Sequence, residues 1–211
     1  MGTPPRLVPL LDQYAFARER LAARLNGPVM DSGNGTEVKV DGPLADAEYF
    51  WEPVAGCLSV RLRDAGPGPR ATELAGRGDW GRDASAEQPR ERPPFTTLSW
   101  RLSHLTEMLT LRADHTAGTH ALTRDDYLVA GDAATALADF DTAATAWHEA
   151  LLAADDRALD TVGYSTYPHG SDPEDLFLET VWWVNQELLH HGAEIALLRD
   201  LYRDAGGHDL R

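Results

Sequence analysis

Apolar residues recur at helical spacing in four segments of this chain, and this periodicity constrains the fold more than any other feature. The first segment, residues 7–25, carries its apolar side chains at Leu7, Leu10, Leu11, Tyr14, Ala17, Leu21 and Leu25. Steps of three and four residues place such positions on one face of a helix. The same spacing returns after Pro94 up to about residue 115, in 132–154, and in 173–203. Because strand-like alternation is weak elsewhere, we predict an all-α fold, a four-helix bundle with long crossover loops.

Capping residues predict where these helices begin and end. The first should stop at Asn26-Gly27-Pro28, and the second should begin at an N-cap formed by Thr96 or Thr97. Asp172 can cap a last helix whose first position is Pro173, and the glycines at 206–207 should terminate it. A short additional helix is expected around residues 44–50.

The length of 211 residues suits one domain, which we take to span residues 1–211. Residues 29–43 lack periodicity and are expected to form a connecting loop. Residues 64–93 are rich in glycine, proline and charged residues. We predict a flexible insertion loop there, more simply explained as a tolerated surface insertion than as a lid or partner surface.

Charge and composition exclude several classes of function. The formal net charge of −15 opposes binding to nucleic acid or to an anionic membrane surface, and we expect neither partner. No apolar run reaches the roughly 18 residues of a spanning helix, and the first residues do not resemble a secretion signal, so a cytoplasmic location is expected. Cys57 is the only cysteine and is interpreted as structural. Lys39 is the only lysine, so arginine supplies the other eighteen basic residues, a bias typical of a GC-rich genome.

Three residues on two predicted helices form a candidate site for a divalent metal. Glu187 and His191 are four residues apart, so their side chains share one helix face and can reach one ion. His104 lies in the middle of the second helix, beside its leucine stripe. An equally weighted alternative makes His104 a hydrogen-bonded, half-buried histidine and the other two a solvated pair. His190, with Gln186, is the second choice of ligand, since an amide is a poorer ligand for a transition metal.

Other polar and aromatic residues receive weaker interpretations. Glu107 follows His104 by one turn and Glu194 follows His191 by one turn, which makes each a candidate catalytic base or hydrogen-bond partner of a ligand, although both could be surface charges. Trp100, Trp147, Trp182 and Trp183 are interpreted as core filling rather than as a cofactor-stacking surface. Motifs of nucleotide-binding proteins and of serine hydrolases are absent.

Two segments resemble a known family. They are Trp-Arg-Leu-Ser-His-Leu-Thr-Glu-Met at 100–108 and Trp-Val-Asn-Gln-Glu-Leu-Leu-His-His-Gly-Ala-Glu-Ile at 183–195, and they are similar to the DinB-like superfamily. The flanks at 46–53 and 94–100 are similar to actinobacterial members. The resemblance implies an up-and-down four-helix bundle with one metal, bound here by His104, Glu187 and His191. Many relatives have histidine at the position of Glu187, whereas mycothiol-dependent maleylpyruvate isomerase has glutamate there.

The resemblance also implies a function. Characterised relatives use bacillithiol or mycothiol, and the GC-rich bias favours mycothiol. We therefore expect a metal-dependent thiol S-transferase or isomerase that binds a small-molecule thiol and an electrophilic substrate, with zinc as the expected metal and nickel or iron as alternatives. Two other functions stay open: hydrolysis of a small substrate, with Glu107 or Glu194 as base, and a non-enzymatic, metal-stabilised homodimer that binds a ligand.

Overall fold

The computed structural model describes residues 2–27, 30–31, 37–38, 42–85, 94–165 and 174–206. Within these ranges the chain is mostly helical, as the sequence predicts, with long helices α1 (Val8–Asn26), α3 (Leu98–Ala117), α4 (Ala133–Leu152) and α6 (Phe177–Asp204). The short helices α2 (Asp46–Tyr49) and α5 (Asp156–Leu159) precede α3 and α6 respectively, and α2 falls inside the predicted segment 44–50.

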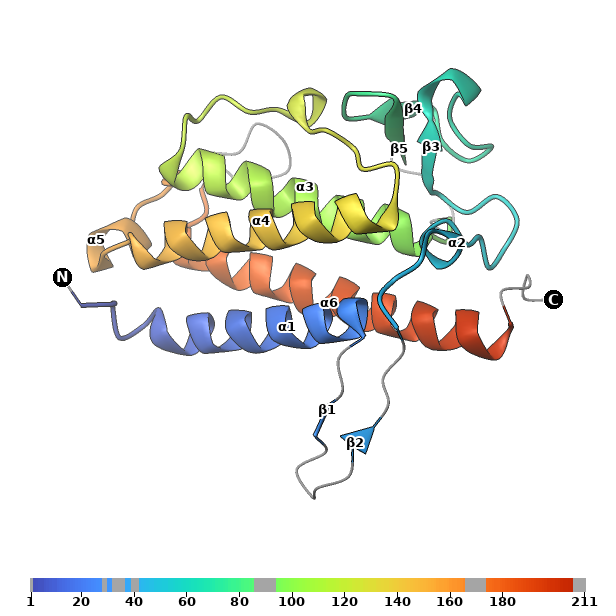
Figure 1. Cartoon of the computed structure of the whole chain (residues 1–211). Coiled ribbons are helices and arrows are strands. Elements are labelled where there is room, and N and C mark those ends of the chain that lie inside the picture. The colour runs from blue at the N-terminus through green and yellow to red at the C-terminus, as the bar shows by residue number, and fades with distance from the viewer. Residues whose placement is uncertain are drawn as a thin grey trace.

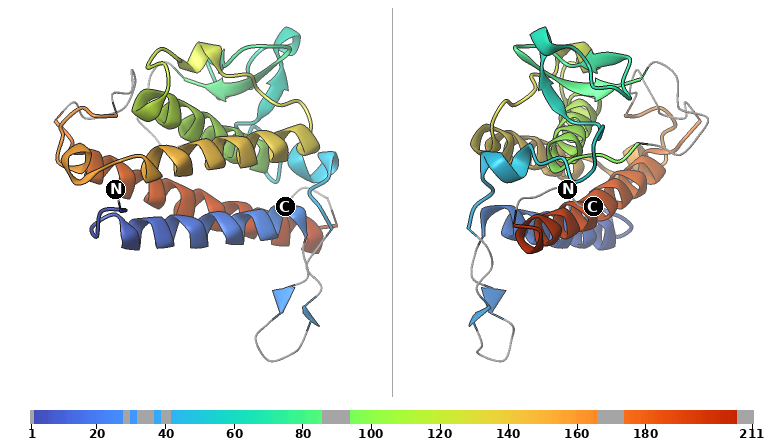
Figure 2. Two further views of the ribbon diagram at one scale, coloured as in Figure 1. Left: turned by 60° about the vertical axis from the view of Figure 1, so that its left-hand side comes forward. Right: turned by 90° about the vertical axis from the view of Figure 1, so that its right-hand side faces the viewer.

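The long helices pack through the apolar faces that the sequence pattern indicates. Helix α3 packs against α4 and α6, and α1 packs against α6 and α4. Figure 1 shows α3 and α4 lying over α1 and α6, and the first view of Figure 2 shows the same arrangement. Their shared core is fully or almost fully buried and includes Tyr14, Leu21, Leu102, Leu105, Phe140, Trp147, Val184 and Leu188.

Caps fix three of the predicted helix boundaries, two of them through a side chain and one through a glycine. The Thr97 hydroxyl accepts a hydrogen bond from the Trp100 backbone N–H at the start of α3, and Asp132 accepts one from Thr135 at the start of α4. Gly27 ends α1 in the left-handed conformation, with a φ of 70°. These boundaries agree with the sequence to within a residue or two.

The start of α6 differs from the prediction. The helix begins at Phe177, and Asp172 and Pro173 lie outside the described residues. The Glu179 carboxylate accepts the backbone N–H of Leu176 at 2.8 Å. This reciprocal half of a capping box stabilises a helix start that comes later than the proline signal indicated.

A small antiparallel sheet occupies part of the segment predicted to be a flexible loop. Strands β3 (Val60–Leu62), β4 (Glu73–Ala75) and β5 (Trp80–Ala84) pair in the order β3-β5-β4, and a 3₁₀ turn, η1 (Arg63–Ala65), follows β3. The sheet contacts α3, and Figure 1 shows it above that helix. The expectation of a loop over 64–93 is therefore wrong for β4 and β5, while its flexibility stays a prediction and residues 86–93 lie outside the described part.

The central strand β5 escaped the sequence pattern because two of its buried positions, Arg82 and Asp83, are charged. Asp83 of β5 has no exposed surface. Its carboxylate accepts hydrogen bonds from the backbone N–H groups of Ser59 and Gly68, at 2.9 and 2.8 Å, and from Nε of Arg61 at 2.8 Å. This polar network stabilises the short sheet together with a small apolar cluster of Val60, Tyr127 and Val129.

The remaining elements are short. Strands β1 (Met30–Asp31) and β2 (Glu37–Val38) pair within the predicted connecting loop 29–43, whose other residues are mostly outside the described ranges. A 3₁₀ turn, η2 (Arg124–Asp126), lies between α3 and α4. None of the helices in the described ranges has the length and apolarity needed to cross a membrane.

Candidate metal centre

Side chains from α3 and α6 meet at a single point. Glu187 and His191 stand one turn apart on α6, and His104 faces them from α3. One carboxylate oxygen, Oε2 of Glu187, lies 3.3 Å from Nε2 of His104 and 3.3 Å from Nε2 of His191. One donor atom from each residue lies within 4.8 Å of the other two. All three residues are partly exposed, so the cluster is open to solvent on one side.

The donor spacing fits a bound divalent cation. Ligand atoms about 2.0–2.2 Å from a tetrahedral zinc ion are roughly 3.4 Å from one another. The separations of 3.3 Å between Oε2 of Glu187 and the two Nε2 atoms match that edge length. Two imidazoles and one carboxylate also leave a fourth position for water or substrate.

The tautomer of His191 strengthens this fit. Its Nδ1 lies 2.7 Å from Oε2 of Glu194, which accepts, and 3.4 Å from Nη1 of Arg101, which donates. The shorter contact with the carboxylate favours a proton on Nδ1. In a neutral imidazole the lone pair is then on Nε2, which faces another carboxylate, that of Glu187. Two facing acceptors need a proton or a cation between them. The arrangement therefore fits either a charged His191 or a metal ion.

The surroundings favour the protonation states that metal binding requires. Hydrogen bonds with His104 and then with His191, which require an N–H at Nε2 when no ion is bound, hold the pKa of Glu187 well below its ordinary range, against the opposing effect of burial. Burial lowers the pKa of His104, and this effect outweighs the hydrogen bond to Glu187. An ionised carboxylate and a neutral imidazole are the forms that bind a cation.

Glu194 and His190 lie beside the ligands in different roles. Glu194 forms an ion pair with Arg101, whose side chain is mostly buried, as well as the hydrogen bond to His191. The side chain of His190 is 63% exposed, against 13% for His191, and its Nε2 is 3.3 Å from Oε1 of Glu194. The geometry thus supports His191 over His190 as the ligand.

Glu107 has a different environment from the one expected of a base at the metal. It is buried on α3 and forms ion pairs with Arg82 of β5 and with Arg124, whose Nε lies 3.0 Å from Oε1. Both carboxylate oxygens are therefore occupied by guanidinium groups. Its catalytic role remains a prediction, as does that of Glu194.

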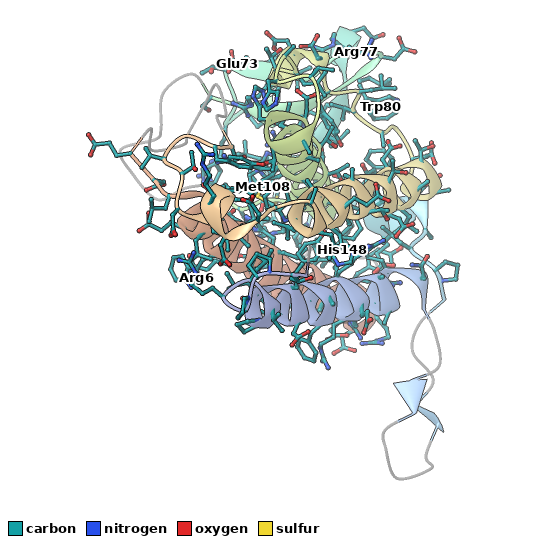
Figure 3. The ribbon with its side chains drawn as sticks, turned by 90° about the vertical axis from the view of Figure 1, so that its left-hand side faces the viewer. Arg6, Glu73, Arg77, Trp80, Met108 and His148 are labelled. Atoms are coloured by element: carbon teal, nitrogen blue, oxygen red, sulfur yellow. The ribbon has the colours of Figure 1, made fainter. Side chains whose placement is uncertain are left out.

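The tryptophans divide between core and site. Trp147 is fully buried as predicted, but Trp182 is 54% exposed, so core filling is wrong for that residue. The Trp100 ring stacks on the His104 imidazole, with centroids 5.3 Å apart and planes 21° from parallel. Figure 3 shows Met108, one turn after His104, near the middle of the molecule, and Glu73 of β4 and Arg77, in the β4–β5 connection, at its top.

Sequence reasoning missed Arg82, Arg101 and the stack of Trp100 on His104. Arg101 precedes His104 by three residues and so shares its helix face, a spacing that could have identified it. Arg82 lies in β5, a strand that the sequence periodicity did not predict, and no sequence signal links it to the site.

A family model, that of the DinB superfamily, matches residues 39–195, and this stretch contains His104, Glu187 and His191. No curated protein and no solved structure matches the chain. The family match covers well over half of the sequence. The three residues of the cluster lie on α3 and α6, the two helices that the resemblance indicated. The chain therefore belongs to the DinB superfamily.

Proposed function

We propose that the protein is a metal-dependent enzyme that activates a thiol for attack on a small electrophilic substrate, as a thiol S-transferase or isomerase. The observation that carries the proposal is the convergence of His104, Glu187 and His191 on one point at the solvent-accessible side of the α3–α6 contact. Family membership supports a metal at this place, in an up-and-down bundle of the four long helices. Zinc is the proposed ion, with nickel and iron as alternatives.

The chemistry follows from the ligand set. His104, Glu187 and His191 would hold the ion. When bound, it would supply a Lewis acid that lowers the pKa of a thiol and so favours the reactive thiolate. The protein would orient the ligands and balance their charge. Glu194 would keep Nε2 of His191 directed at the site, and Glu187 would neutralise part of the charge of the metal ion. Arginine replaces lysine almost throughout the chain, a bias typical of GC-rich genomes, and this bias supports mycothiol as the thiol.

The test combines metal analysis with a thiol-dependence assay. Purified protein should contain about one zinc ion per chain by elemental analysis. Zinc-loaded protein should consume an aromatic halide electrophile, such as chlorodinitrobenzene, in the presence of mycothiol, and consumption should stop without thiol. Bacillithiol and glutathione serve as comparison thiols, and protein treated with a chelator is the control.

The other outcomes separate the competing functions. Turnover of ester or amide substrates without thiol would support metal-dependent hydrolysis, with Glu194 as the nearer candidate base. Stoichiometric metal without either activity would support a metal-stabilised homodimer that binds a ligand. Protein without metal after expression in zinc-supplemented medium would contradict all three.

A further inference from the structure

The small sheet reaches the ligand cluster through one side chain, Trp100. Its indole ring covers the His104 imidazole, as described above. The indole Nε1–H donates a 2.8 Å hydrogen bond to the backbone carbonyl of Asp83 in the central strand β5. The Trp100 backbone N–H is bound by the cap hydroxyl of Thr97. Hydrogen bonds therefore hold both the backbone of Trp100 and the Nε1 edge of its indole ring.

The neighbour of Asp83 covers the same ring. The guanidinium carbon of Arg82 lies 5.1 Å from the centroid of Trp100, a distance at which a cation is attracted to an aromatic face. Arg82 is 2% exposed. It is neutralised by Glu107, which also binds Arg124. A buried arginine is costly to desolvate, and here its charge is compensated by an ion pair whose other partner comes from α3 itself.

The two candidate ligand histidines differ in what orients them. The other ring nitrogen of His191 is hydrogen-bonded to Glu194. Metal-bound histidines usually have such a partner. Among the described residues, by contrast, Nδ1 of His104 has no hydrogen bond to a protein group, and its ring is fixed instead by the stack on Trp100 and by the edge contact with His191.

We propose that Trp100, which contacts both His104 and Arg82, is a positioning residue that sets the orientation of the His104 ring toward the metal, in place of the usual hydrogen-bond partner. The proposal rests on the metal centre of the proposed function. It also gives the sheet a role, because Arg82 and Asp83 of β5 hold the indole. The strand thereby becomes a supporting part of the metal centre, although it contributes no ligand.

Three variants test the proposal by zinc affinity, measured in competition with a chromophoric chelator. Trp100→Leu removes the stacked ring and should weaken zinc binding about 10- to 100-fold, the usual effect of losing an orienting partner. Trp100→Phe keeps a stacking ring without the N–H and should recover most of that loss. Arg82→Lys keeps the charge that Glu107 needs but removes the flat guanidinium, and it should weaken binding less than Trp100→Leu.

A second readout separates positioning from a general loss of stability. Cobalt substituted for zinc should show visible absorption bands that are shifted in Trp100→Leu and Arg82→Lys, and restored in Trp100→Phe. The matched control is Trp182→Leu, the same change at an exposed tryptophan of α6, which should leave affinity and spectrum unchanged.

The outcomes are distinct for the two proposals. Wild-type zinc affinity and an unshifted cobalt spectrum in Trp100→Leu would overturn the positioning role while leaving the metal centre intact. If Trp100→Leu does not fold, zinc affinity and the cobalt spectrum of Arg82→Lys and Trp100→Phe test the proposal instead. Wild-type values for Arg82→Lys together with weaker binding by Trp100→Phe would show that ring stacking does not orient His104. A wild-type protein that binds no metal would overturn the proposed function and this inference together.

Discussion

At the scale of single residues, His190 and His191 are chemically identical neighbours with opposite surroundings. His191 faces Glu187 and is mostly buried, whereas His190 is exposed. We expect His191→Ala to weaken zinc binding by more than about 100-fold, because it removes a ligand rather than an orienting partner. His190→Ala should change it by only a few fold. Chelator competition measures both, and the reverse order would show that the ligand assignment is wrong.

Asp114, near the end of α3, offers a pH-dependent prediction. Burial raises its pKa, but hydrogen bonds from Leu122, Thr119 and Ala121 outweigh that effect and lower the pKa to about 2. A folded-state pKa below the unfolded one stabilises the protein above the ordinary value of 3.8, and this stability is lost as the pH falls toward 2.

The Asp114→Asn variant should therefore lose about 1–3 kcal/mol of unfolding free energy at pH 7. Its difference from the wild type should narrow between pH 4 and pH 2, where the wild-type carboxylate becomes protonated. Urea denaturation at several pH values measures this. Asp12→Asn, at an exposed position of α1, is the control and should change little at any pH. An equal loss at pH 7 and pH 2 would exclude the ionised carboxylate as the cause.

Sequence reasoning brought together the three candidate ligands because each lies on a strongly periodic helix, where spacing fixes the face. It did not indicate the ion-pair partners of Glu107, whose catalytic role stays a prediction. A step of three residues leaves a rotation of about 60° around the helix, and this is enough to direct Glu107 to Arg82 instead of the cluster. The partner residue that causes the difference is 25 positions away in the sequence, so no local pattern contains it.

At the scale of elements, β5 replaces the predicted flexible loop with an ordered central strand. It pairs with β3 on one side and β4 on the other. We expect the backbone amides of Trp80–Ala84 to exchange with deuterium more slowly than those of residues 66–70, which no strand includes. Hydrogen exchange followed by mass spectrometry measures this. Equally fast exchange in both segments would support the original expectation of a mobile insertion.

The helices could be predicted and the sheet could not, for a physical reason. An amphipathic helix buries one apolar stripe, so its sequence shows the period of the structure. Strand β5 buries Arg82 and Asp83, and their burial is compensated by ion pairs and hydrogen bonds to residues distant in the sequence. Compensation of this kind depends on tertiary structure and leaves no period in the chain.

A buried ion pair joins α2 to α6 and yields a stability prediction. Arg199 is 2% exposed, and its Nε and Nη2 lie 2.7 and 3.0 Å from the two carboxylate oxygens of Glu48. Glu48→Gln leaves the buried guanidinium without a counter-charge and should lower the free energy of unfolding by about 3–5 kcal/mol. Urea denaturation measures the loss.

The control for this variant is an exposed pair between α1 and α4. Asp141 is bound to Arg18 at 2.7 Å, but its side chain is 72% exposed. Removing that charge with Asp141→Asn should cost about 0–1 kcal/mol, since solvent screens exposed pairs. A similar loss in both variants would mean that burial does not decide the contribution of the Glu48 pair.

At the scale of the whole molecule, the candidate metal cluster and the apolar core lie in different places and should stabilise the fold independently. The candidate ligands lie at a partly exposed edge between α3 and α6, while the large apolar side chains are buried between all four long helices. Folding that depends on metal is typical of small domains without a sufficient core. A domain of this size buries enough apolar surface to fold without an ion.

Removal of the metal should therefore lower the stability of the protein without unfolding it. Chelator-treated protein should keep the far-ultraviolet circular dichroism of the native helices. Zinc at about 100 times its Kd should add about 2.7 kcal/mol to the unfolding free energy, which corresponds to a rise in Tm of roughly 5–10 °C for a chain of this length. Differential scanning calorimetry measures the rise, and His191→Ala should show almost none because it lacks a ligand. Loss of helical signal on chelation would instead place the metal among the determinants of the fold, and an equal rise in His191→Ala would mean that zinc binds elsewhere.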